Sequence, residues 1–332
     1  MPKLTAAGSK LSPRFFRRGA VACLLMLFSW SSLANTLHVT LIPSHDNGAY
    51  RRVIDAVVAR IGTQTEAGIS LQIANLKAFN ENRAEIDRAS DLLIPIGIRA
   101  TDNIIRQAGK TPILATLVLR ASFHASLKRR AAEGFTTGER RIGAILLDQP
   151  VRRQLHLSRL LFGRVKRIGI PLGPDSRSLR DQIEHFAQYF ELPVEIEDID
   201  AADNLMQRLS RLMDRSDVLL ALPDPLIFNR RNVRYILLST YRKRIPVIGF
   251  SQSYVKAGAL AASYSSPEQI GRQTAEAIIR LRQNPAFELP ATLPPKYFSV
   301  AINEQVARSF GYTDLSAQDL AESIRRLEQN AQ

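Results

Sequence analysis

The chain has 332 residues, of which 45% are hydrophobic, and carries 45 Lys and Arg against 31 Asp and Glu, a formal net charge of +14. This length supports domains that fold on core burial alone, and the single cysteine, Cys23, excludes a disulfide framework. The basic clusters at 128–130, 230–231 and 242–244 lack the interleaved aromatic residues of RNA-binding proteins, so we expect no nucleic-acid partner and interpret each cluster first as a solvated helix end or turn. The net positive charge indicates attraction to an anionic lipid surface or an acidic protein, or serves solubility alone.

The first 34 residues predict export. Basic residues precede an apolar run from Ala20 to Trp30, and Ser32-Leu33-Ala34 supplies the small residues that signal peptidase requires. The alternative is a membrane anchor, but the run is shorter than the roughly 20 residues that span a bilayer. We therefore predict a signal peptide over residues 1–34 and a periplasmic chain beginning near Asn35, with 40 basic and 31 acidic residues, a formal +9.

From residue 37, apolar strand runs alternate with amphipathic helical runs. The spacing of Val53, Ile54, Val57 and Ile61 predicts a helix that Gly62 ends. Five strands alternating with helices indicate one α/β unit. The expected strands cover residues 37–42, 69–76, 92–96, 112–117 and 142–147, and helices are expected at 83–89 and 101–107.

A second α/β series follows a helix at residues 151–161. Near its end, Ser266 and Pro267 supply a helix cap and a proline at the first helical position. The two series have the usual size of domains. Strands are expected at 167–172, 194–199, 218–222, 246–250, 259–263 and 296–302, and helices at 179–190, 205–213, 235–240, 270–281 and 316–330.

Two of these strands end in polar loops. Residues 218–222 lead into Pro223-Asp224-Pro225, and residues 246–250 lead into Ser251-Gln252-Ser253. Ligands of open parallel sheets bind at the carboxyl ends of the strands. This block therefore predicts a small-molecule site.

The same residues carry a resemblance to a known family. Residues 218–225, 246–253, 255–260 and 266–273 are similar to the ABC transporter substrate-binding proteins with the type I periplasmic binding fold. Asp148-Gln149-Pro150, followed by Gln154, Leu157, Leu161 and residues 165–170, resembles the entry into that family's second lobe. The similarity covers most of the chain after the signal and is strongest over residues 141–281.

The resemblance implies a two-lobed α/β fold, each lobe a parallel sheet flanked by helices, with three hinge crossovers. Lobe one would comprise residues 35–149 and 259–283, and lobe two residues 150–258 and 296–332. A small molecule held by both lobes would favour a closed monomer, which an ABC permease or another inner-membrane partner recognises. The alternative is a sensory module that reports ligand state to a receptor or kinase without transport.

The ligand-binding candidates lie in the expected strand-end loops. Asp46, Asp175 and Asp224 also suit helix caps, and both roles stay open. The family's usual loop after the fourth strand is replaced here by residues 117–124, which puts that side of the site in doubt. The candidates are Ser44, His45, Asp46, Asn47, Gly97, Ala115, Thr116, Gly173, Asp175, Ser176, Asp224, Ser251 and Gln252.

An enzyme is the rival class, and the sequence gives it little support. Ser44-His45-Asp46 contains the residue types of a catalytic triad, but consecutive residues project in different directions. The five histidines are scattered without metal-ligand spacing. We therefore expect neither catalysis, nor a metal, nor a cofactor.

Overall fold

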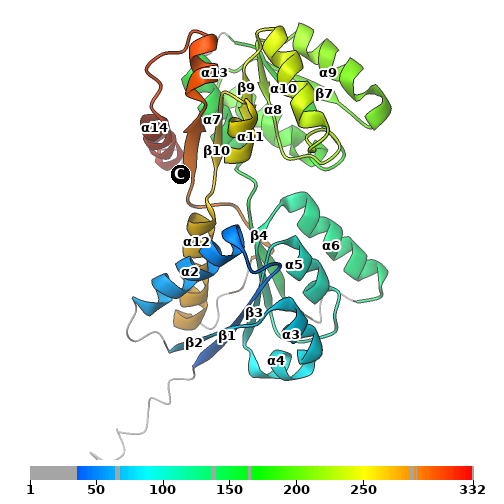
Figure 1. Ribbon diagram of the computed structural model, residues 1–332, viewed down its shortest axis with the longest axis vertical. Helices are drawn as coiled ribbons and strands as arrows, with labels where there is room; N and C mark the ends of the chain where they lie inside the picture. Colours follow the sequence, from blue (N-terminus) through cyan, green and yellow to red (C-terminus); the bar gives the residue numbers. More distant parts are fainter. Residues whose placement is uncertain are drawn as a thin grey trace, which may run out of the picture. The chain divides into compact units, whose positions relative to one another are not determined.

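A computed structural model describes residues 36–63, 68–135, 140–163, 166–284, 288 and 290–330 (Figure 1). The expected signal peptide lies outside the described residues. Two six-stranded sheets with helices on both faces make up the fold, which is the expected two-lobed α/β architecture.

The first sheet is parallel throughout and has the strand order β11-β5-β4-β3-β1-β2. One face is covered by α2 and α12, which pack on each other, and the other by α3, α4, α5 and α6. The strands are β1 (Leu37–Pro43), β2 (Ile69–Ile73), β3 (Leu92–Ile96), β4 (Ile113–Val118), β5 (Ile142–Leu146) and β11 (Thr292–Leu293); the helices are α2 (Gly48–Gly62), α3 (Leu76–Glu81), α4 (Arg83–Ala89), α5 (Ile98–Ile105), α6 (Arg120–Ala132) and α12 (Pro267–Gln283).

The second sheet has the order β12-β10-β9-β8-β6-β7 and is parallel except for β12, which runs antiparallel to β10. Helices α7, α8 and α14 cover one face, and α9, α10 and α11 cover the other. The strands are β6 (Ile168–Leu172), β7 (Val194–Asp198), β8 (Val218–Leu220), β9 (Val247–Gly249), β10 (Ala261–Tyr264) and β12 (Ser299–Ile302); the helices are α7 (Val151–Phe162), α8 (Arg180–Tyr189), α9 (Leu205–Asp214), α10 (Asn232–Arg242), α11 (Gln252–Ala257), α13 (Glu304–Ser309) and α14 (Ala317–Gln329).

Local sequence explains some of the element boundaries, among them the caps of α3, α11, α12, α13 and α14. The expected start of α12 is confirmed: Ser266 and Gln269 form a capping box, and Pro267 follows the cap. Strands β3 and β6 are buried along their whole length, as expected for parallel strands covered on both faces.

Three expectations need correction. Strand β2 ends at Ile73, because Asn75 caps α3 through its side chain and Leu76 begins that helix. The fourth strand does not end at Leu117, since β4 continues to Val118 and α6 begins at Arg120. Strand β10 pairs with β9 and β12, so its backbone lies in the second sheet and not in the first lobe. The other lobe boundaries stay a proposal.

Side chains connect the three segments that cross between the sheets. Gln149 Nε2 donates to Ser265 Oγ at 2.9 Å, and Ser265 Oγ donates to the Tyr297 carbonyl at 2.6 Å. Arg153 donates to Gln149 Oε1 at 2.8 Å and to the Pro295 carbonyl at 3.0 Å. The crossovers therefore share one hydrogen-bonded cluster.

Candidate ligand-binding cleft

A cavity of about 770 Å³ lies where loops from both sheets meet. Its walls come from α2, from the ends of β4, β5, β8 and β9, and from the crossover between β10 and α12. Both its volume and its place at the carboxyl ends of parallel strands are typical of small-molecule sites. The lining residues are Arg52, Leu117, Leu119, Leu147, Pro223, Phe250, Ser251, Gln252, Ser253, Tyr264, Ser265, Ser266, Pro267 and Glu268.

The charged lining residues form one ion pair. Arg52 Nε lies 2.8 Å from Glu268 Oε1, and both side chains are about half exposed. A hydrogen bond from Ser266 and the nearby Arg52 guanidinium lower the pKa of Glu268. The two charges offset each other, so the cavity wall has no net charge.

Apart from Gln252 and Pro267, the remaining lining divides into an apolar and a hydroxyl-bearing set. Phe250 packs against Tyr254 and Phe228 behind the wall, with ring centroids 5.1 and 6.0 Å away. The apolar set is Leu117, Leu119, Leu147, Pro223 and Phe250, and the hydroxyl-bearing set is Ser251, Ser253, Tyr264, Ser265 and Ser266. Such a wall suits a molecule that has both an apolar part and hydrogen-bonding groups.

Of the expected ligand residues, the cavity brings together Ser251 and Gln252. Ser251 also caps α11, since its hydroxyl accepts from the Tyr254 N–H at 3.2 Å. The predicted loop after β9 therefore lies at the cavity. Within it, Ser251 both caps α11 and lines the cavity.

Asp224 does not have the expected position at the cleft mouth. Its side chain is 2% exposed. Oδ2 accepts from the Asp175 N–H, the Ser176 N–H and the Ser176 hydroxyl at 3.1, 3.0 and 2.9 Å, while Oδ1 accepts from the Leu226 N–H at 3.0 Å. The carboxylate thus joins the loops after β6 and β8 and holds Pro223 at the cavity wall.

Gly173 and Ser176 belong to the same buried network. Gly173 donates its N–H to Ser176 Oγ at 2.9 Å, and a Cβ at Gly173 would lie 2.4 Å from Asp224 Oδ1. Only glycine permits this approach. Asp175 is exposed, and only its backbone takes part.

In the loop after β1, Ser44 has a structural role and does not line the cavity. Its buried hydroxyl accepts from the Ala100 N–H at 2.9 Å and so caps the first turn of α5. Gly97, with φ of +86°, allows this contact, because a Cβ there would meet Tyr50 and Ser44. His45, Asp46 and Asn47 are exposed and do not belong to the cavity lining.

Ala115 and Thr116 are not strand-end residues. Both are fully buried, and Thr116 Oγ1 lies 3.0 Å from Thr274 Oγ1 of α12. Because β4 continues to Val118, the positions that reach the cavity are Leu117 and Leu119. A left-handed backbone at Leu117, with φ of +57°, accompanies a register irregularity between Thr116 and Val118.

Sequence reasoning missed the crossover residues Tyr264 to Glu268 and Arg52. The sequence indicates one of these positions in part, because Ser266 is predicted as a helix cap. That prediction gives the start of a helix and does not indicate a cavity wall. Arg52 lies on the exposed side of α2, where periodicity alone indicates a solvated charge.

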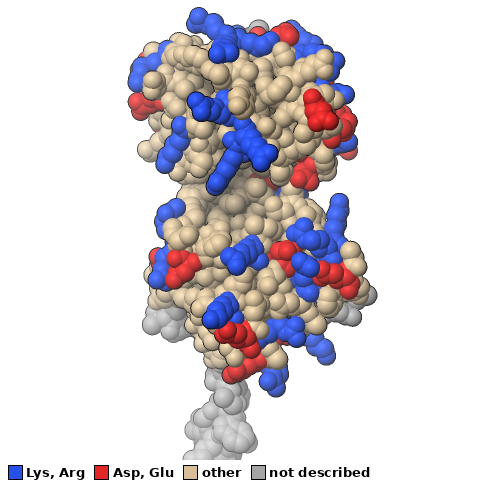
Figure 2. All heavy atoms as spheres, turned by 45° about the vertical axis from the view of Figure 1, so that its right-hand side comes forward, with Lys and Arg blue, Asp and Glu red and all other residues tan. Residues whose placement is uncertain are grey.

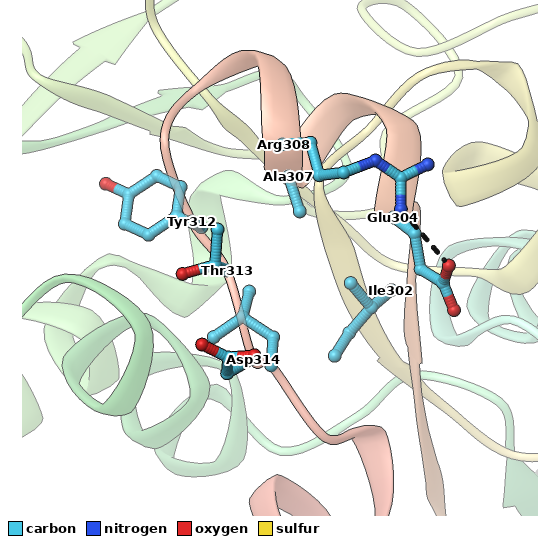
Figure 3. A pocket seen from close by; sticks show the side chains of 8 residues that line it. Ile302, Glu304, Ala307, Arg308, Tyr312, Thr313 and Asp314 are labelled. Atoms are coloured by element: carbon cyan, nitrogen blue, oxygen red, sulfur yellow. Dashed lines mark hydrogen bonds and ion pairs between the residues drawn. The ribbon is translucent and has the colours of Figure 1, made fainter.

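Two smaller pockets each involve a single lobe. One, of about 290 Å³, lies in the second lobe between β12, α13 and the segment that follows (Figure 3). Figure 3 shows the Glu304–Arg308 ion pair on one side of this pocket and Tyr312 on the other. The other, of about 410 Å³, is formed by Leu76, Lys77, Asn80, Glu81 and Arg99.

Comparison with known proteins agrees with this geometry. The family model described as "ABC transporter substrate binding protein" matches residues 63–313, and the chain belongs to that family. Its fold is the type I periplasmic binding fold, and the family's members bind solutes. A search of curated proteins finds no match.

Solved structures share the fold at low identity. A ligand-free, open substrate-binding protein with adhesive properties from Clostridium difficile is 17% identical over 84% of this chain and 96% of its own, with a TM-score of 0.63. An ABC domain in complex with L-Trp from Streptococcus pneumonia is 13% identical over 86% and 98%, with a TM-score of 0.54. A conserved domain protein from Vibrio cholerae is 18% identical over 85% and 97%, with a TM-score of 0.53.

Proposed function

We propose that this protein captures a small organic solute in the cavity between its two lobes and delivers it to an ABC transporter in the inner membrane. The observation that carries the proposal is the lining of one cavity by strand-end loops of both sheets. A solute that contacts both lobes favours a closed form through its differential affinity, and the closed form is what the membrane partner would recognise.

The lining supports a solute with an apolar part and several hydrogen-bonding groups, bound without chemical change. Phe250 and the three leucines supply apolar contact, while the serines, Tyr264 and Gln252 supply donors and acceptors. The proposed location is the periplasm, reached through the predicted signal peptide. None of the helices in the described part of the chain has the length and apolar character needed to cross a bilayer.

A thermal-shift screen of the protein beginning at Asn35 tests capture, with amino acids, nucleosides, vitamins and sugars as probes. A bound solute at about 100 times its dissociation constant adds roughly 2.7 kcal/mol of stability. Deletion of the gene should then abolish uptake of that solute by cells, and the full chain should restore it. If the protein binds a solute but cells without the gene take up that solute normally, the result would support the sensory alternative. If the protein is folded and no probe stabilises it, the result would contradict solute capture.

A further inference from the structure

Helix α10 carries an unusual outward face. Its inner positions, Ile236, Leu237 and Thr240, are buried against the second sheet. Its outer positions leave large apolar side chains in solvent: Tyr235 is 64% exposed, Leu238 46% and Tyr241 54%. These three residues recur at helical spacing and form one stripe.

Basic residues flank this stripe. Residues 230–244 contain six Lys and Arg and no Asp or Glu. Of these, Lys243 pairs with Asp214, whereas Arg231, Arg234 and Arg242 are exposed. Figure 1 shows α9 and α10 on the right-hand side of the second lobe, and Figure 2 turns this side toward the viewer. In Figure 2 this lobe carries a group of Lys and Arg side chains with no acidic residue among them.

We infer that the outward face of α10, defined by Arg231, Arg234, Tyr235, Leu238, Tyr241 and Arg242, docks on the surface of a bilayer that contains anionic phospholipids. Three observations favour a lipid surface. The face combines tyrosines and a leucine with arginines, the residue types that anchor interfacial helices. Within the described part of the chain, Asp214 pairs with Lys243, and no carboxylate pairs with Arg231, Arg234 or Arg242, so these three cations are available to lipid phosphates. The face is the outer surface of a helix, whereas the known pockets lie elsewhere.

The docking face on α10 is separate from the solute cavity. The cavity is lined from the second lobe by Pro223, residues 250–253 and Tyr264 of β10, and α10 contributes none of its lining. Attachment to the membrane would hold the protein near an inner-membrane partner without occupying its solute site.

Vesicle sedimentation tests the inference with the protein that starts at Asn35. This truncation is needed because the apolar run before it would bind vesicles by itself, and both sheets with their cores lie within Leu37–Gln332. Wild type should sediment with vesicles of phosphatidylcholine and phosphatidylglycerol, but not with vesicles of phosphatidylcholine alone. The protein should dissociate from the anionic vesicles as the salt concentration increases.

Charge variants separate a local face from net charge. Replacing Arg231, Arg234 and Arg242 by Gln should lower partitioning roughly one hundredfold, since each cation near an anionic surface contributes about fivefold. A matched control replaces Arg51, Arg83 and Arg326 by Gln; these are exposed arginines outside α10, and their loss should change partitioning far less. Equal losses in the two triple variants would overturn the inference.

A fluorescence probe reports insertion directly. The only tryptophan is Trp30, so the chain from Asn35 has none. Tyr235→Trp should show a blue-shifted emission when anionic vesicles are added. Tyr189→Trp is the control, because Tyr189 is 68% exposed and lies on α8, on the opposite face of the sheet. Equal emission of Tyr235→Trp with and without vesicles overturns the inference and leaves an acidic protein surface as the partner that fits this face.

Discussion

The Asp224 carboxylate accepts a hydrogen bond of 2.9 Å from the Ser176 hydroxyl, and through it the loops after β6 and β8 are joined. Both carboxylate oxygens accept hydrogen bonds from backbone N–H groups. In Asp224→Asn, the amide NH₂ would replace one of these oxygens and would face an N–H group, so that a donor would lie opposite a donor. We therefore predict that Asp224→Asn lowers the free energy of unfolding by about 1–3 kcal/mol.

Urea unfolding of Asp224→Asn measures this loss. Asp46→Asn is the control, because Asp46 is exposed in the loop after β1, and its effect should stay within about 0.5 kcal/mol. A stability of Asp224→Asn equal to that of wild type would mean that the buried network contributes nothing.

The Arg153–Glu328 pair anchors the crossover cluster. Two hydrogen bonds of 2.9 and 2.8 Å join them, and their side chains are 5% and 13% exposed. Arg153→Met leaves a buried carboxylate without its partner and removes the bonds to Gln149 and Pro295. We expect a loss of about 3–5 kcal/mol in unfolding free energy.

Arg308→Met provides the contrast, since the ion pair of Arg308 with Glu304 is largely exposed. Its loss should cost at most about 1 kcal/mol. Thermal unfolding of both variants should separate them clearly, and similar midpoints would contradict the role of the buried pair.

His156 predicts a pH dependence of stability. Its side chain is buried against Phe190, with ring centroids 4.3 Å apart, and burial lowers its pKa from 6.5 to about 4. Above pH 6.5 the imidazole is neutral in both states, so its full contribution is present. As the pH falls from 6.5 towards 4, only the unfolded chain gains the proton, and stability decreases by up to about 3 kcal/mol.

Urea midpoints measured across this pH range test the assignment. His156→Leu should remove much of the decrease, whereas the control His45→Gln, at an exposed position, should retain it. The same slope in wild type and His156→Leu would assign the acid sensitivity to other groups.

Periodicity predicted the architecture because buried parallel strands and amphipathic helices leave plain patterns, as in β3, α4 and α9. Short elements such as α3 and α11 have too few residues for a period to appear. The site was harder to predict. Strand-end position identified Ser251 and Gln252, but it could not show that Asp224 turns inward to serve backbone N–H groups, or that Arg52 meets Glu268 from a distant segment.

The central claim is that the solute binds in the cavity between the lobes. Calorimetric titration of wild type and Ser253→Trp with a solute found in the screen tests it most directly, because an indole at Ser253 would fill part of this cavity. Thr313→Trp, at the second-lobe pocket of Figure 3, is the control. We predict that affinity falls at least about one hundredfold, or roughly 2.7 kcal/mol, in Ser253→Trp alone. Wild-type affinity in Ser253→Trp, with the fold intact, would contradict the account.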